Sequence, residues 1–166
     1  MTTRHKMPRR RERAVSLQVQ SPSFHQGERI PVWHSILGGN ESPELSWAEL
    51  PADTVSLALL CEDPDAAGMD PFVHWLVANI QPIQVGDGLP RGVGEIQGAV
   101  LGRNNFNRVG YDGPAPPPGK IHHYHFRIYA LDCLLDVDDG FTRLDLIRAM
   151  QGRVLANGEL MGTFSR

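Results

Sequence analysis

Three mostly apolar runs, at residues 55–61, 72–80 and 122–131, constrain the fold of this chain most. Runs of this length bounded by Gly, Pro and Asp are typical of buried β-strands. Shorter strands are predicted at residues 15–19 and 45–47. The 17 glycines and 13 prolines favour many turns over a helical bundle. The pattern therefore predicts a mainly β fold, either a sandwich or an open barrel.

One segment near the C-terminus is predicted to be helical. Thr142 and Asp145 have the spacing of a capping box, and apolar residues then recur at helical spacing as far as Val154. The Asn-Gly pair that follows is typical of a helix end. We therefore expect a helix within residues 142–157 and a short final strand over residues 159–164.

The N-terminus differs sharply in charge from the rest of the chain. Residues 1–13 hold six Lys and Arg against one acidic residue, about +5, so the net charge of -3 leaves about -8 for the remainder. We predict a basic flexible tail over 1–13 and a single domain over 14–166. An acidic body is a poor nucleic-acid binder, so no specific nucleic-acid partner is expected. A contact of the tail with RNA or an anionic membrane stays open.

The cellular location is predicted to be cytoplasmic. No run reaches the ~20 apolar residues that span a membrane, and the basic start lacks the apolar stretch of a signal peptide. Cys61 and Cys133 have no metal-type spacing, so we expect both to be reduced, although a disulfide between them stays open.

Polar residues follow the first two strong strands. Asp63 and Asp65 flank Pro64, which restricts the backbone on both sides and holds the two carboxylates in a rigid turn; a plain Asx-type turn is the alternative. In the run 72–80, alternation places His74 on the face opposite Trp75. Both faces are apolar, so His74 needs a hydrogen-bond partner, and a structural bond to a backbone carbonyl is its alternative role.

The third run begins with histidines. Alternation puts His122 and Tyr124 on one face and His123 and His125 on the other, so the three histidines do not converge and no metal site is predicted. In the preceding loop, residues 110–119, prolines remove N–H groups while glycines let the backbone approach a ligand. Such a loop forms either an anion cradle or a rigid connector.

Taken together, these motifs resemble the phosphatidylethanolamine-binding protein family, in its bacterial Raf-kinase-inhibitor-like branch. The matching motifs are Asp-Pro-Asp-Ala at 63–66, His-Trp at 74–75, the Gly/Pro loop at 110–119 and His-His-Tyr at 122–124. The resemblance covers about residues 15–166. It implies a β-sandwich with a C-terminal helix, few peripheral helices and a small anion pocket. The implied site comprises Asp63, His74, His122 and Tyr124, with Asp65 supporting the turn, Phe72 at the rim and the backbone from Gly113 to Pro116 as one wall.

Four residues depart from the family pattern. Ala67 stands where a proline is common, Asn107 where a glycine is common, and Ala115 where relatives often have cysteine. His123 replaces the usual arginine, which puts in doubt any salt bridge that this arginine makes in relatives. Because His123 faces away from the pocket by alternation, the change is not expected to abolish binding.

The resulting hypothesis is a binding protein for a small anion or a phosphoryl headgroup, without catalysis or cofactor. A regulatory, kinase-inhibitor-like role is expected, with a phosphate-like anion or phospholipid headgroup as ligand; a kinase or protease partner and a homodimer stay open. Asp63 is expected to keep a histidine protonated or to accept a ligand proton. One alternative is an enzyme using Asp63, His74 and His122 in metal-assisted or acid/base hydrolysis. Another is a protease inhibitor or other interaction module.

Overall fold

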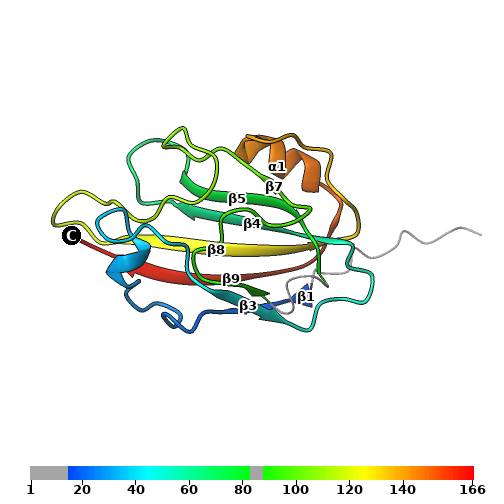
Figure 1. Cartoon of the computed structure of the whole chain (residues 1–166), viewed down its shortest axis with the longest axis horizontal. Helices are drawn as coiled ribbons and strands as arrows, with labels where there is room; N and C mark the ends of the chain where they lie inside the picture. Colours follow the sequence, from blue (N-terminus) through cyan, green and yellow to red (C-terminus); the bar gives the residue numbers. More distant parts are fainter. Residues whose placement is uncertain (1–14, 83–87) are drawn as a thin grey trace, which may run out of the picture.

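Two β-sheets and one α-helix make up the part of the chain that this computed structural model describes, residues 15–82 and 88–166 (Figure 1). The larger sheet has six strands in the order β1-β9-β8-β4-β5-β7, and the smaller has three in the order β2-β3-β6. The prediction of a mainly β fold with a C-terminal helix is confirmed. The elements are β1 Val15–Ser16, β2 Gln18–Gln20, the 3-10 helix η1 Val32–His34, β3 Leu45–Ala48, β4 Ser56–Asp63, β5 Phe72–Ile80, β6 Gly88–Leu89, β7 Val100–Leu101, β8 His122–Leu131, α1 Arg143–Met150 and β9 Val154–Phe164.

The main hydrophobic core lies between the two sheets, with Trp47, Trp75 and Phe126 among its large side chains. The other face of the larger sheet packs against α1 and the segment before it, where Leu60 contacts a cluster that includes Leu146. Strands β4 and β5 are therefore covered on both faces, and nearly all of their residues are buried. This double coverage explains why their sequences are continuously apolar instead of alternating.

The predicted helix is present but shorter than expected. Its capping box forms as predicted, since the Thr142 hydroxyl accepts from the Asp145 amide and the Asp145 carboxylate accepts from the Thr142 amide. The helix ends at Met150, because Gly152 adopts φ +74° and turns the chain. Val154, which matched the helical spacing, instead begins β9, and the expected Asn-Gly helix end lies inside that strand.

Strand β5 contains a bulge that the alternation pattern did not predict. Cys61 of β4 pairs with Trp75 and Glu62 pairs with Val73, so His74 is an extra residue on β5. Trp75 joins the core between the sheets together with Tyr124, and the His74 ring lies 5.2 Å from that of Tyr124. The placement of His74 and Trp75 on opposite faces was therefore wrong, since the bulge lets both side chains lie on the Tyr124 side of the sheet.

The first predicted strand divides between the two sheets. Residues 15–16 pair in parallel with β9, whereas residues 18–20 pair with β3 of the small sheet. The Leu17 amide donates to the Asn157 carbonyl at 2.7 Å at the point where the chain passes from one sheet to the other.

A buried carboxylate ties α1 to the larger sheet. The side chain of Glu62 is 3% exposed and forms ion pairs with Arg127 of β8 and with Arg143 of α1, the latter at 2.6 Å. Arg127 also reaches Glu159 of β9 at 2.8 Å. Two guanidinium groups thus neutralise a carboxylate that would otherwise be costly to bury.

Arg143→Ala is expected to lower the free energy of unfolding by about 1 kcal/mol, because one charged hydrogen bond is lost while Arg127 still neutralises Glu62. Urea unfolding measures the change. Arg148→Ala, at an exposed position of the same helix, is the matched control and is expected to change stability by less than ~0.5 kcal/mol. Equal effects of the two substitutions would contradict the role assigned to this ion pair.

The sequence also led to expectations about membrane spans, the two cysteines and the N-terminal tail. Within the described ranges, no helix has the length and apolar character needed to cross a membrane. Cys61 and Cys133 are both free thiols, and burial raises the pKa of the Cys61 thiol well above its usual value. The predicted basic tail, residues 1–13, lies outside the described residues.

Candidate functional site

A cavity of about 290 Å³ lies where β4, β5 and β8 meet the turn after β4 and the proline-rich loop. Six of the eight predicted site residues line it: Asp63, Phe72, His74, Pro116, His122 and Tyr124. Asp65 and Gly113 do not line it, and each has a different structural role.

Asp63 and His122 form a buried pair at the start of the cavity wall. Asp63 is the last residue of β4, and its side-chain Oδ2 accepts a hydrogen bond from Nδ1 of His122 at 2.6 Å. Asp63 and His122 are only 3% and 8% exposed. The other carboxylate oxygen accepts from the Asp65 amide at 2.8 Å, which is the Asx-type turn considered from the sequence. The carboxylate thus fixes the orientation of the His122 ring.

His74 is held by the proline-rich loop. Its Nδ1 donates to the backbone carbonyl of Asp112 at 2.7 Å, and the Asp112 amide donates to the His74 carbonyl at 3.1 Å. Burial lowers the pKa of His74 below its usual value, although the Asp112 carbonyl opposes this effect. His74 therefore makes the structural bond to a carbonyl that the sequence left open, and also lines the cavity as a neutral ring near pH 7.

The Asp112 carboxylate anchors this loop from behind. Its side chain is 4% exposed and pairs with the guanidinium of Arg108 at 2.5 Å. The side-chain amides of Asn104 and Asn40 also donate to it, at 2.7 and 2.9 Å. These contacts keep residue 112, and with it the carbonyl that binds His74, in one position.

Tyr124 contributes a phenol to the cavity. Burial raises the pKa of Tyr124 well above its usual value, and the nearby Asp63 carboxylate raises it further. The phenol therefore stays protonated across the physiological range, so its O–H remains a hydrogen-bond donor.

Asp65 joins the turn to the beginning of β8. Its Oδ2 accepts from the backbone amide of His123 at 2.8 Å and from Nδ1 of His123 at 2.7 Å. Partial burial raises the pKa of Asp65, but the hydrogen bonds from His123 outweigh it and lower the pKa below its usual value. His123, one of the residues that depart from the family pattern, thus makes its own side-chain hydrogen bond with the turn. This contact lies on the strand face away from the cavity, as alternation predicted.

Gly113 packs the loop instead of forming the cavity wall. Its amide donates to Oδ1 of Asn40 at 2.7 Å, and its Cα lies tightly against the His34 carbonyl, where a Cβ would overlap the carbonyl oxygen. The wall predicted for residues 113–116 is formed instead by Ala115, Pro116 and Pro117, because Gly113 is already engaged by the neighbouring segment.

The model of a family described as phosphatidylethanolamine-binding protein matches residues 20–165. The chain belongs to this family. The UPF0098 protein of Methanothermobacter thermautotrophicus is 39% identical over 152 residues, which cover 90% of this chain and 99% of that protein.

Two solved structures of the phosphatidylethanolamine-binding protein family share the fold. A homologue from Chlamydia trachomatis is 36% identical and YbcL of E. coli, described as a new member of the mammalian family, is 32% identical. Each has a TM-score of 0.84 and matches over 92% of this chain and 99% of its own. The resemblance drawn from four short motifs is thereby confirmed, together with the fold that it implied.

Sequence reasoning missed one aromatic of the cavity, Phe106. Its ring packs edge-on against Phe72, with centroids 4.8 Å apart, and lies 5.6 Å from the ring of His74. Asn104 positions it, because its side-chain oxygen accepts from the Phe106 amide at 3.0 Å. A lone aromatic inside an Asn-rich turn shows no strand or helix periodicity, and the asparagines were the signal available.

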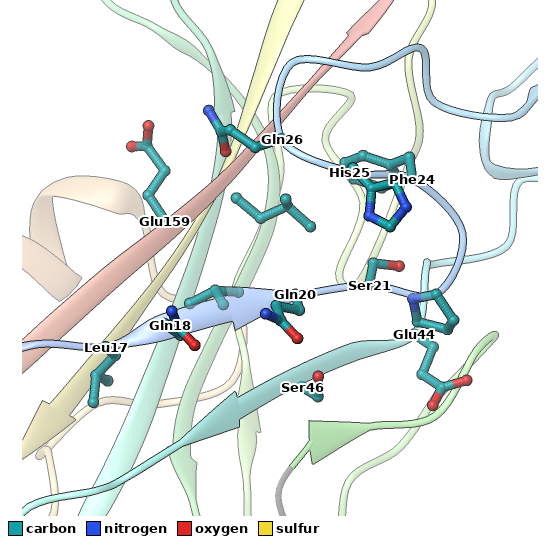
Figure 2. Close-up of a pocket in the computed structure, with 13 residues that line it drawn as sticks. Leu17, Gln18, Gln20, Ser21, Phe24, His25, Gln26, Glu44, Ser46 and Glu159 are labelled. Carbon is teal, nitrogen blue, oxygen red and sulfur yellow. The ribbon is translucent and has the colours of Figure 1, made fainter.

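A larger groove of about 830 Å³ lies between β2, β9 and the segment after β2. Figure 2 shows glutamine and serine side chains along it together with apolar ones, and the two acidic residues of its lining are Glu44 and Glu159. Glu159 is already paired with His125 and Arg127. The smaller cavity is the better candidate, because there buried ionisable groups of this family member face one another. Among the described residues, no three His, Cys, Asp or Glu side chains are placed to hold a metal ion.

Proposed function

We propose that this protein binds the phosphoryl group of a small ligand in the cavity formed by Asp63, His74, His122 and Tyr124, without chemical conversion. The observation that carries the proposal is the buried Asp63–His122 pair, which lies beside two further polar rings in one small cavity. A phosphoryl oxygen favours charged and neutral N–H and O–H donors. His122, when its ring is protonated, supplies a charged donor, and the Tyr124 hydroxyl supplies a neutral one.

The lining of the cavity supports a small ligand. Phe72, Phe106 and Pro116 give it apolar walls, and about 290 Å³ is at the lower end of the volumes of small-molecule sites. A phosphoryl group bearing a short organic substituent fits this combination of apolar walls and a few convergent polar groups.

The regulatory part of the proposal rests on family membership alone. We propose that the protein acts in the cytoplasm and that ligand occupancy modulates its contact with a protein partner, a kinase or a protease. A shared fold does not transfer a partner, so this part needs its own test by co-purification in the presence and absence of phosphate.

The geometry also favours one alternative, acid/base hydrolysis. A carboxylate bonded to an imidazole, with a second imidazole nearby, is an arrangement that can move protons. Incubation with phosphate esters, followed by 31P NMR, separates the two functions. Binding predicts intact ester, whereas accumulating inorganic phosphate would favour the enzyme. Metal analysis of protein purified without chelator tests the metal-assisted version.

Tyr124→Phe is expected to weaken the binding of phosphorylethanolamine roughly threefold to tenfold, because it removes one neutral hydrogen-bond donor and leaves the ring packing intact. Isothermal calorimetry measures the dissociation constant. Tyr129→Phe, which alters a tyrosine of β8 packed on the helix side of the sheet, is the matched control and is expected to leave affinity unchanged. If phosphate, phosphorylethanolamine and nucleotides all fail to raise the thermal midpoint, the proposed function is wrong.

A further inference from the structure

The two histidines of the cavity present opposite hydrogen-bonding groups to a ligand. A backbone carbonyl can only accept, so the 2.7 Å contact with the Asp112 carbonyl places the proton of His74 on Nδ1. The neutral ring then carries a lone pair on Nε2. Among the described residues, the hydrogen bond recorded for the His74 ring is the one made by Nδ1.

The surroundings of His74 keep its ring neutral. Phe72 and Phe106 cover it with uncharged rings, and Tyr124 meets it edge-on. The ionisable groups that face it are Asp63 from β4, His122 and Tyr124 from β8, and Asp112 from the loop. Burial lowers the pKa of His74 and outweighs the opposing effects of the Asp63 and Asp112 carboxylates.

His122 has the reverse polarity. Its Nδ1–H donates to the Asp63 carboxylate at 2.6 Å. An anionic ligand oxygen can bind at Nε2 only in the ring form that also carries a proton there, and in that form both ring nitrogens of His122 are donors. A ligand that satisfies both rings must offer an acceptor to His122 and a donor to His74.

We propose that the cavity selects a phosphate monoester in its singly protonated form, with the P–OH group donating to Nε2 of His74 and an anionic oxygen accepting from Nε2 of His122. This inference rests on the proposed function, and it narrows the ligand class. A phosphodiester, including the headgroup of an intact phospholipid, has no P–OH proton near neutral pH and would direct only acceptors at the His74 lone pair. The preferred ligand is thus a soluble monoester.

The selection has a measurable consequence in proton uptake. The second ionisation of a phosphate monoester lies near pH ~6, so the free ligand is mostly a dianion at pH 7. Binding of the monoanion requires the ligand to take one proton from solvent. A tenfold preference for the monoanion raises the second pKa of the bound ester by one pH unit, because a tenfold ratio corresponds to that shift.

The 31P chemical shift of phosphorylethanolamine tests this directly, because it reports the protonation of the ligand itself. In wild-type protein, we expect the pKa of the bound ester to be at least about one pH unit above that of the free ester. Glycerophosphorylethanolamine, the diester, and sulfate are expected to bind at least about tenfold more weakly at pH 7. A bound ester with an unchanged or lowered pKa, or a diester that binds as tightly as the monoester, overturns the inference.

His74→Gln supplies a second test, because a side-chain amide can turn its N–H toward the ligand. The pKa of the bound ester should fall toward that of the free ester, and the difference in affinity between the monoester and the diester should become smaller. His25→Gln, at an exposed histidine lining the separate groove, is the matched control and should change neither quantity. Failure of every phosphoryl ligand to bind would reject the proposed function, whereas binding without a raised pKa rejects only this selection. If the His74 variant does not fold, the 31P titration of phosphorylethanolamine bound to the wild-type protein still tests whether the cavity selects the monoanion.

Discussion

Gly113→Ala is expected to lower the free energy of unfolding by about 3 kcal/mol, at the upper end of the usual cost of overpacking. The added Cβ would overlap the His34 carbonyl oxygen and lie 2.9 Å from Cα of Ser35. Both are backbone atoms, so no side-chain rotation can relieve the clash. The proline-rich loop would have to move away from η1, and this would displace the Asp112 carbonyl that orients His74. Ligand affinity is therefore expected to fall with stability.

Gly94→Ala is the matched control for this substitution. Its Cβ would meet open space, and Gly94 is not among the glycines with positive φ, so the change in stability should stay within ~0.5 kcal/mol. Urea unfolding followed by tryptophan fluorescence measures both variants. A Gly113→Ala protein as stable as wild type would show that the loop is not held against the His34 segment as described.

The strands whose bounds the sequence predicted best are two long strands inside the larger sheet. Residues 72–80 and 122–131 coincide with β5 and β8 because long apolar runs between turn residues have few other ways to be buried. The helix was predicted at its start, where capping chemistry is local to Thr142 and Asp145. Its end was not, because Val154 fits both periodicities and pairing with β8 decides between them.

The candidate site was predicted in its residues but not in its internal bonding. Motif order brought Asp63, His74 and His122 together, and the structure places all three around one cavity. The pairing of Cys61 with Trp75, which makes His74 a bulged residue, depends on the register between two strands. Register is a tertiary property that alternation within one strand cannot reveal. The hydrogen bond from the Asn40 side-chain amide to Asp112 was also not predictable, because it joins residues that are far apart in the sequence.

His122→Asn is expected to weaken the binding of phosphorylethanolamine roughly 10- to 150-fold, the equivalent of about 1.5–3 kcal/mol for a hydrogen bond to a charged group. The asparagine amide can occupy the position of Nδ1 and still donate to Asp63, so the buried carboxylate keeps a partner. Only the Nε2 donor directed at the ligand is removed. The substitution therefore separates the ligand contact from the structural contact, which His122→Ala would remove together.

His123→Asn is the matched control for the same residue change one position along β8. The side chain of His123 is 45% exposed and bonds to Asp65 on the face away from the cavity, and Asp65 also keeps its bond from the His123 backbone amide. Calorimetric titration should therefore give an affinity close to that of wild type, and thermal midpoints should confirm that both variants are folded. Equal losses of affinity in the two variants would mean that His122 does not contact the ligand. A large loss confined to His122→Asn, in a protein whose thermal midpoint is little changed, is the result that the buried Asp63–His122 pair predicts.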